Sequence, residues 1–173
     1  MRLWHKDLIA LLPPELLTSQ WRELCLIAKA IGEKGTPGNS AVNKIMDYDI
    51  SHFLTYCKKI CNEMHAREYT CKLDSIIPKW FKDTPEVSDN DLFKDWHTDR
   101  YLKQCYYALE EKYDNGSLSD EELAKIREVC GRCFEDEIKN INSVVLDTSS
   151  NKVSVEQLKK LLLMHPQSLT LKL

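Results

Sequence analysis

A glutamate on a predicted helix is the residue of this 173-residue chain whose type and position most suggest chemistry. The segment SQWRELCLIAKAIG (19–32) has apolar residues at helical spacing, and Glu23 falls at the edge of the apolar stripe. A carboxylate that faces an apolar wall can have a raised pKa or act as a protected anion. Most such glutamates are solvated or salt-bridged, so a catalytic role for Glu23 requires a reactive partner elsewhere in the chain.

The cysteines are a second candidate for chemistry. Cys130 and Cys133 form a CxxC, but a zinc site needs about four ligands and no second pair stands at a matching spacing. Both thiols fall on the apolar stripe of their predicted helix, as Cys57 and Cys61 do on theirs. Because free cysteine behaves as a small hydrophobic residue, core packing is the favoured interpretation. A metal or redox protein that uses Cys130 and Cys133 stays as an alternative.

Other familiar sites are absent from the sequence. The five histidines show no metal-binding spacing, and there is no nucleophile elbow, phosphate-binding glycine loop or dinucleotide fingerprint. We therefore expect no cofactor and no metal. Four tyrosines of the segment 96–113 share a predicted helix with Arg100 and Lys103, where they could stack on single-stranded bases. Half-buried tyrosines with solvated hydroxyls are the favoured interpretation. The tyrosines are Tyr101, Tyr106, Tyr107 and Tyr113.

Composition predicts a cytoplasmic protein with a real hydrophobic core. The chain is 43% hydrophobic, yet it has no apolar run near the roughly 20 residues that a membrane span needs. Seven cysteines without an export signal indicate reduced thiols. The net charge is −3, from 24 basic and 27 acidic residues, which argues against strong non-specific attraction to nucleic acid.

The elements that must position these residues are predicted to be helices. Periodicity and capping signals place helices at 7–12, 14–32, 49–67, 90–113 (with a break near Trp96), 119–140 and 154–165. Loops are expected at 32–40 and 114–117, and residues 68–88 are expected to be irregular. The predicted fold is an all-α, compact bundle of five to six helices. It divides into a core (1–113) and an accessory C-terminal helical segment (114–173).

The N-terminal block resembles a known family. A chain that opens Met-Arg-Leu and continues some twenty residues later with Trp21-Arg22-Glu23-Leu24 is similar to the pyrimidine-dimer DNA glycosylase (phage endonuclease five-like) family. AVNKIMDYDISHFLTYCKKICNEMHAREY (41–69) is similar to its next helix, and LEEKY (109–113) to the end of a later one. The likeness covers residues 1–113, is most specific at the N-terminus, and is greatest to the family's bacterial chains.

This resemblance implies an all-helical DNA repair enzyme, a DNA glycosylase/AP lyase (endonuclease) acting on pyrimidine-dimer or abasic nucleotides. Its nucleophile would be the α-amino group of the chain, here that of Met1, which forms a Schiff base with the sugar. Glu23 matches the glutamate that steadies the developing charge and moves protons. Arg2 and Arg22 match arginines that contact phosphate, and Lys29 on the same helix would add to substrate binding. The expected partner is damaged duplex DNA.

Three departures from the family leave a second interpretation open. Arg2 should leave Met1 in place, whereas the phage enzyme of the family exposes a threonine; a further family arginine falls at Leu26; and no aromatic residue follows Phe134 in place of an aromatic, basic tail. Residues 1–113 carry 16 basic and 17 acidic residues, although a local patch with Lys6 and Lys44 is possible. The alternative is a non-catalytic helical binding module that keeps the same fold.

Overall fold

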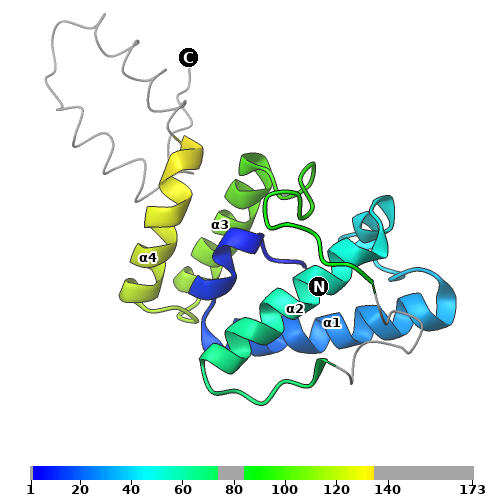
Figure 1. Ribbon diagram of the computed structural model, residues 1–173. Helices are drawn as coiled ribbons and strands as arrows, with labels where there is room; N and C mark the ends of the chain where they lie inside the picture. The colour runs from blue at the N-terminus through cyan, green and yellow to red at the C-terminus, as the bar shows by residue number, and fades with distance from the viewer. Residues whose placement is uncertain (1, 74–83, 135–173) are drawn as a thin grey trace, which may run out of the picture.

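The computed structural model describes residues 2–73 and 84–134 (Figure 1). Within these ranges the regular elements are helices, with no strand, so the predicted all-α class is confirmed. In chain order they are η1 (Lys6–Leu11), α1 (Pro14–Lys34), η2 (Asn43–Asp47), α2 (Ile50–Ala66), α3 (Asp99–Asp114), α4 (Asp120–Cys130) and η5 (Gly131–Phe134), where η marks a 3₁₀ helix.

Helix α1 carries Glu23 and begins where the sequence predicted. Pro14 stands in the first turn, where a missing N–H removes no helical hydrogen bond. The predicted end at Gly32 is wrong by two residues, because the helix continues to Lys34. Gly35 ends it: its φ of 71° is left-handed, and its N–H donates to the Ile31 carbonyl at 2.8 Å. An exposed glycine inside a helix costs only about 1 kcal/mol, so Gly32 need not be the boundary.

Helix α2 packs against α1 and was predicted almost residue for residue. Asp49 is the N-cap, and its side chain accepts a hydrogen bond from the Ser51 N–H at 2.9 Å. The buried face repeats every three to four residues, as an amphipathic helix requires. Its larger members are Phe53, Tyr56, Cys57, Ile60, Cys61 and Met64.

The predicted break near Trp96 is confirmed, and it is larger than expected. Residues 89–97 form turns, and α3 begins only at Asp99. This turn segment is held by its own buried side chains, including Phe93, Trp96 and His97, whose rings pack edge-to-face or tilted with centroids 5.1–5.4 Å apart.

Helix α4 lies beside α3 and also packs against η1 (Figure 1). The predicted capping box is present: the Ser119 side chain accepts from the Glu122 N–H, and the Glu122 carboxylate accepts from the Ser119 N–H. The α-helix ends at Cys130 and continues as η5 to Phe134. Residues 135–140 of the predicted helix, and the whole predicted helix 154–165, lie outside the described residues. The division at residue 113 stays a prediction.

No helix in the described part of the chain has the length and apolar character needed to cross a bilayer.

Candidate active site

The extended segment at residues 2–5 is clamped by side chains from three helices. On the α1 side, the Gln20 side-chain oxygen accepts a hydrogen bond from the Trp4 N–H at 2.9 Å. On the α2 side, the Tyr56 hydroxyl donates to the Trp4 carbonyl at 2.7 Å, and on the α3 side the Tyr101 hydroxyl donates to the Leu3 carbonyl. Gln20 and Tyr56 are buried, so these hydrogen bonds fix the start of the chain within the fold.

Two buried histidines, His5 and His97, also hold the N-terminal segment in place. The Lys6 N–H donates to Nδ1 of His97 at 3.0 Å, and the His5 ring stacks on His97 at 5.1 Å between centroids. Burial lowers the pKa of His97 to about 2 and also lowers that of His5. Both imidazoles are therefore neutral near pH 7, with Nδ1 of His97 acting as an acceptor. Their role is to hold the segment 2–6, not to carry charge.

Glu23 reaches this clamped segment. Its Oε2 accepts a hydrogen bond from the backbone N–H of Arg2 at 3.1 Å. The Glu23 side chain is half-buried, consistent with its predicted place at the edge of the α1 stripe. The carboxylate therefore contacts the backbone of the residue that follows residue 1 in the chain. Met1 itself, the predicted nucleophile, lies outside the described residues.

Arg2 and Glu23 open onto one cavity of about 390 Å³. Three parts of the chain form its wall: the N-terminal segment, the first half of α1, and the end of α3. The lining residues are Arg2, Trp4, Leu16, Ser19, Gln20, Glu23, Ala108, Glu111, Lys112 and Asn115. The Arg2 guanidinium lies 5.5 Å from the centre of the Trp4 ring and donates to the Gln104 carbonyl at 3.1 Å. The volume suits a small organic group, and the wall presents two carboxylates, of Glu23 and Glu111, and two cations, Arg2 and Lys112.

The other predicted cations are not part of this wall. Arg22 and Lys29 are exposed on α1, and neither is among the lining residues. They stand seven residues apart, about two helical turns, so they share one face of α1. Lys29 lies 3.7 Å from Glu33, a surface ion pair. Their substrate-binding roles therefore stay predictions for a ligand that extends beyond the cavity.

Two residues of this site, Lys112 and Tyr56, were not predicted from the sequence. Lys112, at the end of α3, enters the cavity wall only through the packing of α3 next to the N-terminal segment. Tyr56 of α2 was not predicted as part of a site, because no spacing relates it to Trp4, which is 52 positions away. Gln20 had a readable signal: it stands one turn before Glu23 on the same face of α1.

The favoured interpretation of Cys130 and Cys133 is supported by the structure. Both side chains are buried, and burial raises the pKa of Cys130 to about 12 and that of Cys133 to about 11. Thiols so hard to ionise are poor nucleophiles and poor redox groups. The tyrosines of 96–113 are likewise buried or half-buried, and the hydroxyls of Tyr106 and Tyr113 bond to Glu110 and Asp120.

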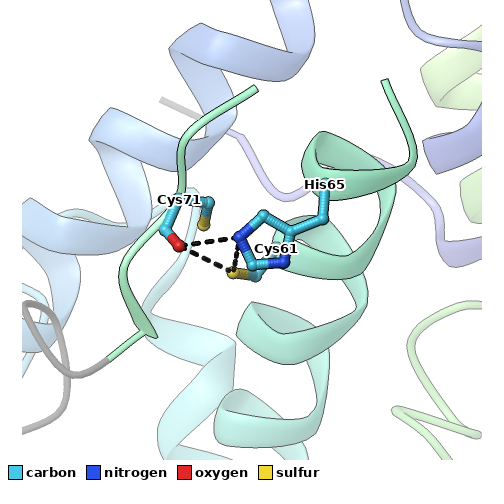
Figure 2. Close-up of side chains that lie close together, drawn as sticks. All are labelled: Cys61, His65 and Cys71. Carbon is cyan, nitrogen blue, oxygen red and sulfur yellow. Dashed lines mark hydrogen bonds between the residues drawn. The ribbon is translucent and has the colours of Figure 1, made fainter. Parts of the chain in front are cut away.

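A different set of side chains has the geometry to hold a metal ion. Cys61, His65 and Cys71 place their ligand atoms within 4.8 Å of one another (Figure 2). None of the three lines the cavity of Glu23. The sequence analysis did not single out this set, because its spacing, C-x₃-H-x₅-C, matches no common motif.

Comparison with known proteins adds one finding. Residues 1–76 match the family model described as pyrimidine dimer DNA glycosylase. A search of curated proteins and a search of solved structures found no match. The matched residues include the clamped N-terminal segment, Arg22 and Glu23 on α1, and all of α2. The resemblance predicted from the N-terminal block is therefore confirmed over residues 1–76, which carry the sequence features of the pyrimidine dimer DNA glycosylase family.

Proposed function

We propose that this protein is a DNA repair glycosylase with an associated AP lyase activity, and that its nucleophile is the α-amino group of residue 1. The observation that carries the proposal is the 3.1 Å hydrogen bond between the Arg2 N–H and Oε2 of Glu23. It brings the predicted proton-transfer carboxylate to the residue next to the predicted nucleophile, at a cavity with cationic groups on its wall. The family match over residues 1–76 supports the same function.

The chemistry suits an α-amine. Its pKa near 8 is about two units below that of lysine, so a useful fraction is neutral at physiological pH. The amine nitrogen attacks C1′ of the damaged nucleotide, the glycosidic C–N bond breaks, and the base leaves with a proton. The ring opens to a Schiff base. Removal of a C2′ proton then expels the 3′-phosphate by β-elimination, and water releases the enzyme.

Glu23 has two tasks in this sequence. Its carboxylate stabilises the positive charge that develops on the sugar as the glycosidic bond breaks. It then relays protons, including that at C2′, for which an ionisable group within hydrogen-bond reach is required. Arg2 and Lys112 are cations on the same wall and would meet the phosphates that flank an extruded nucleotide. Arg22 and Lys29 would extend these contacts along the exposed face of α1.

The test is borohydride trapping on duplexes that contain a pyrimidine dimer or an abasic site. Protein with the authentic N-terminus, checked by intact mass, should form a covalent adduct and cleave the strand. Glu23→Gln should slow cleavage by about 10²–10⁴-fold, the range for loss of general acid–base catalysis. Glu15→Gln is the matched control, since Glu15 is exposed in the first turn of the same helix.

A second comparison isolates the amine. A variant that carries an N-terminal tag moves the α-amine away from Glu23 and should give no adduct, and removal of the tag to residue 1 should restore it. If protein with the authentic N-terminus forms no adduct on either duplex, the enzymatic proposal is wrong. The helical binding module would then be the better description.

A further inference from the structure

The end of α2 and the segment that follows it bring two thiols and an imidazole together. Cys61 and His65 are four residues apart and so lie on one face of α2, while Cys71 returns to them from the chain beyond the helix (Figure 2). Cys61 Sγ lies 3.9 Å from Nε2 of His65, and the same nitrogen lies 2.8 Å from the Cys71 carbonyl oxygen.

We propose that Cys61, His65 and Cys71 bind a zinc ion. Tetrahedral zinc with Zn–S near 2.3 Å and Zn–N near 2.1 Å separates its ligand atoms by about 3.6–3.8 Å. The three ligand atoms here are within 4.8 Å of one another, close to that separation, and zinc would replace the hydrogen bond between Nε2 of His65 and the Cys71 carbonyl. Two thiolates and an imidazole are a soft ligand set that favours zinc over magnesium or calcium. His65 is exposed, which leaves the fourth position open to water.

The backbone holds Cys71 in place for this role. Arg67 follows α2, and its guanidinium donates to the carbonyls of Leu12 at 2.6 Å and Ala10 at 2.8 Å. The same side chain pairs with Glu63 at 2.7 Å. Glu68 adopts a left-handed turn with φ 64°, and the Tyr69 N–H donates to the Met64 carbonyl at 2.8 Å. The segment is therefore fixed against α2 and η1 before any ion binds, which lowers the entropy cost of binding.

Zinc binds cysteine as the thiolate, and Cys61 and Cys71 are both buried free thiols. Zinc binding would release the two thiol protons, so the affinity should increase with pH. This proposal departs from the expectation, based on histidine spacing, that no metal is bound.

The first test measures stoichiometry and coordination. Full-length protein is purified under reducing conditions, stripped with a chelator, loaded with zinc and dialysed, and zinc is counted by plasma mass spectrometry. We expect about one ion per chain, as for one site. Cobalt(II) loaded in place of zinc should give the visible bands of a tetrahedral ion and a thiolate charge-transfer band. Wild-type protein without stoichiometric zinc, or cobalt without the thiolate band, overturns the proposal.

The second test identifies the ligands. His65→Asn changes an exposed side chain and should fold normally, yet it should weaken zinc binding by more than about 100-fold, the upper end for loss of an outer-shell partner. Cys71→Ser should do the same. Cys133→Ser is the matched control, since Cys133 is a buried thiol outside the cluster, and it should keep one ion. If His65→Asn and Cys71→Ser retain zinc, or Cys133→Ser loses it, the assignment is wrong. The cobalt spectrum of wild-type protein does not depend on how the variants fold.

Discussion

At the scale of single residues, charge state follows burial more than residue type. His97 and His5 belong to the residue type that most readily titrates near neutrality, yet their burial keeps both neutral. Glu23, at the margin of the same N-terminal segment, is half-buried and accepts a backbone hydrogen bond. Around residues 2–6, buried neutral groups thus position the chain, while the Glu23 carboxylate contacts its backbone at the cavity wall.

The neutral histidines should make stability fall in mild acid. In the unfolded chain a histidine takes up a proton near pH 6.5, whereas folded His97 does not until about pH 2. The unfolded state therefore binds more protons as the pH falls below 6.5, and the free energy of unfolding decreases, at up to about 1.4 kcal/mol per pH unit for each such histidine. Urea denaturation from pH 6.5 to 5 measures this slope.

His97→Gln should reduce that slope, since glutamine can accept the Lys6 hydrogen bond without titrating. Lys125→Gln, a change at an exposed residue of α4, is the control and should keep the slope because it removes no histidine. An equal slope in His97→Gln and wild-type protein would show that His97 does not stay neutral.

At the scale of elements, the local signals at helix starts were reliable where a side chain provides the cap. Asp49 and Ser119 cap α2 and α4 as predicted. The end of α1 was misplaced because two glycines stand three residues apart, and only their backbone conformation shows which one ends the helix. The start of α3 depends on burial of Phe93, Trp96 and His97. This is a tertiary effect, and no capping residue in the sequence indicates it.

The capping box of α4 should have a measurable effect on stability. Ser119→Ala removes the acceptor for the Glu122 N–H and should lower the free energy of unfolding by about 1 kcal/mol. Ser117→Ala is the control: Ser117 is exposed, and its backbone N–H keeps its bond to the Lys112 carbonyl. Chemical denaturation of both variants tests this, and equal midpoints would mean that α4 does not contribute to the cooperative unit.

At the scale of the whole molecule, the net charge predicts weak non-specific affinity for DNA. With a net charge of −3, affinity must come from a few local cations. Arg2 is at the cavity wall, while Arg22 and Lys29 share a face of α1. A protein of this kind should rely on lesion-specific contacts more than on scanning of undamaged duplex.

The salt dependence of binding to damaged duplex should therefore be shallow. Four phosphate contacts, from Arg2, Lys112, Arg22 and Lys29, would give a slope of log K against log salt concentration of about −3.6. Arg22→Ala should reduce the magnitude of the slope by about 1, whereas Lys125→Ala, an exposed residue of α4, should leave it unchanged. Fluorescence anisotropy over a salt series provides the measurement. An unchanged slope in Arg22→Ala would exclude Arg22 as a phosphate contact.

The sequence by itself determined the helical class, most helix boundaries and the place of Glu23 at the edge of a buried stripe, because these depend on periodicity and on neighbours within one turn. The resemblance to the family added the proposed roles of these residues, phosphate binding for Arg22 and catalysis for Glu23. Only the tertiary structure decided that Glu23 meets the Arg2 backbone, that Gln20, Tyr56 and Tyr101 clamp the same segment, and that Cys71 returns to Cys61 and His65. These contacts join residues far apart along the chain, and they arise from how the helices pack rather than from any local spacing.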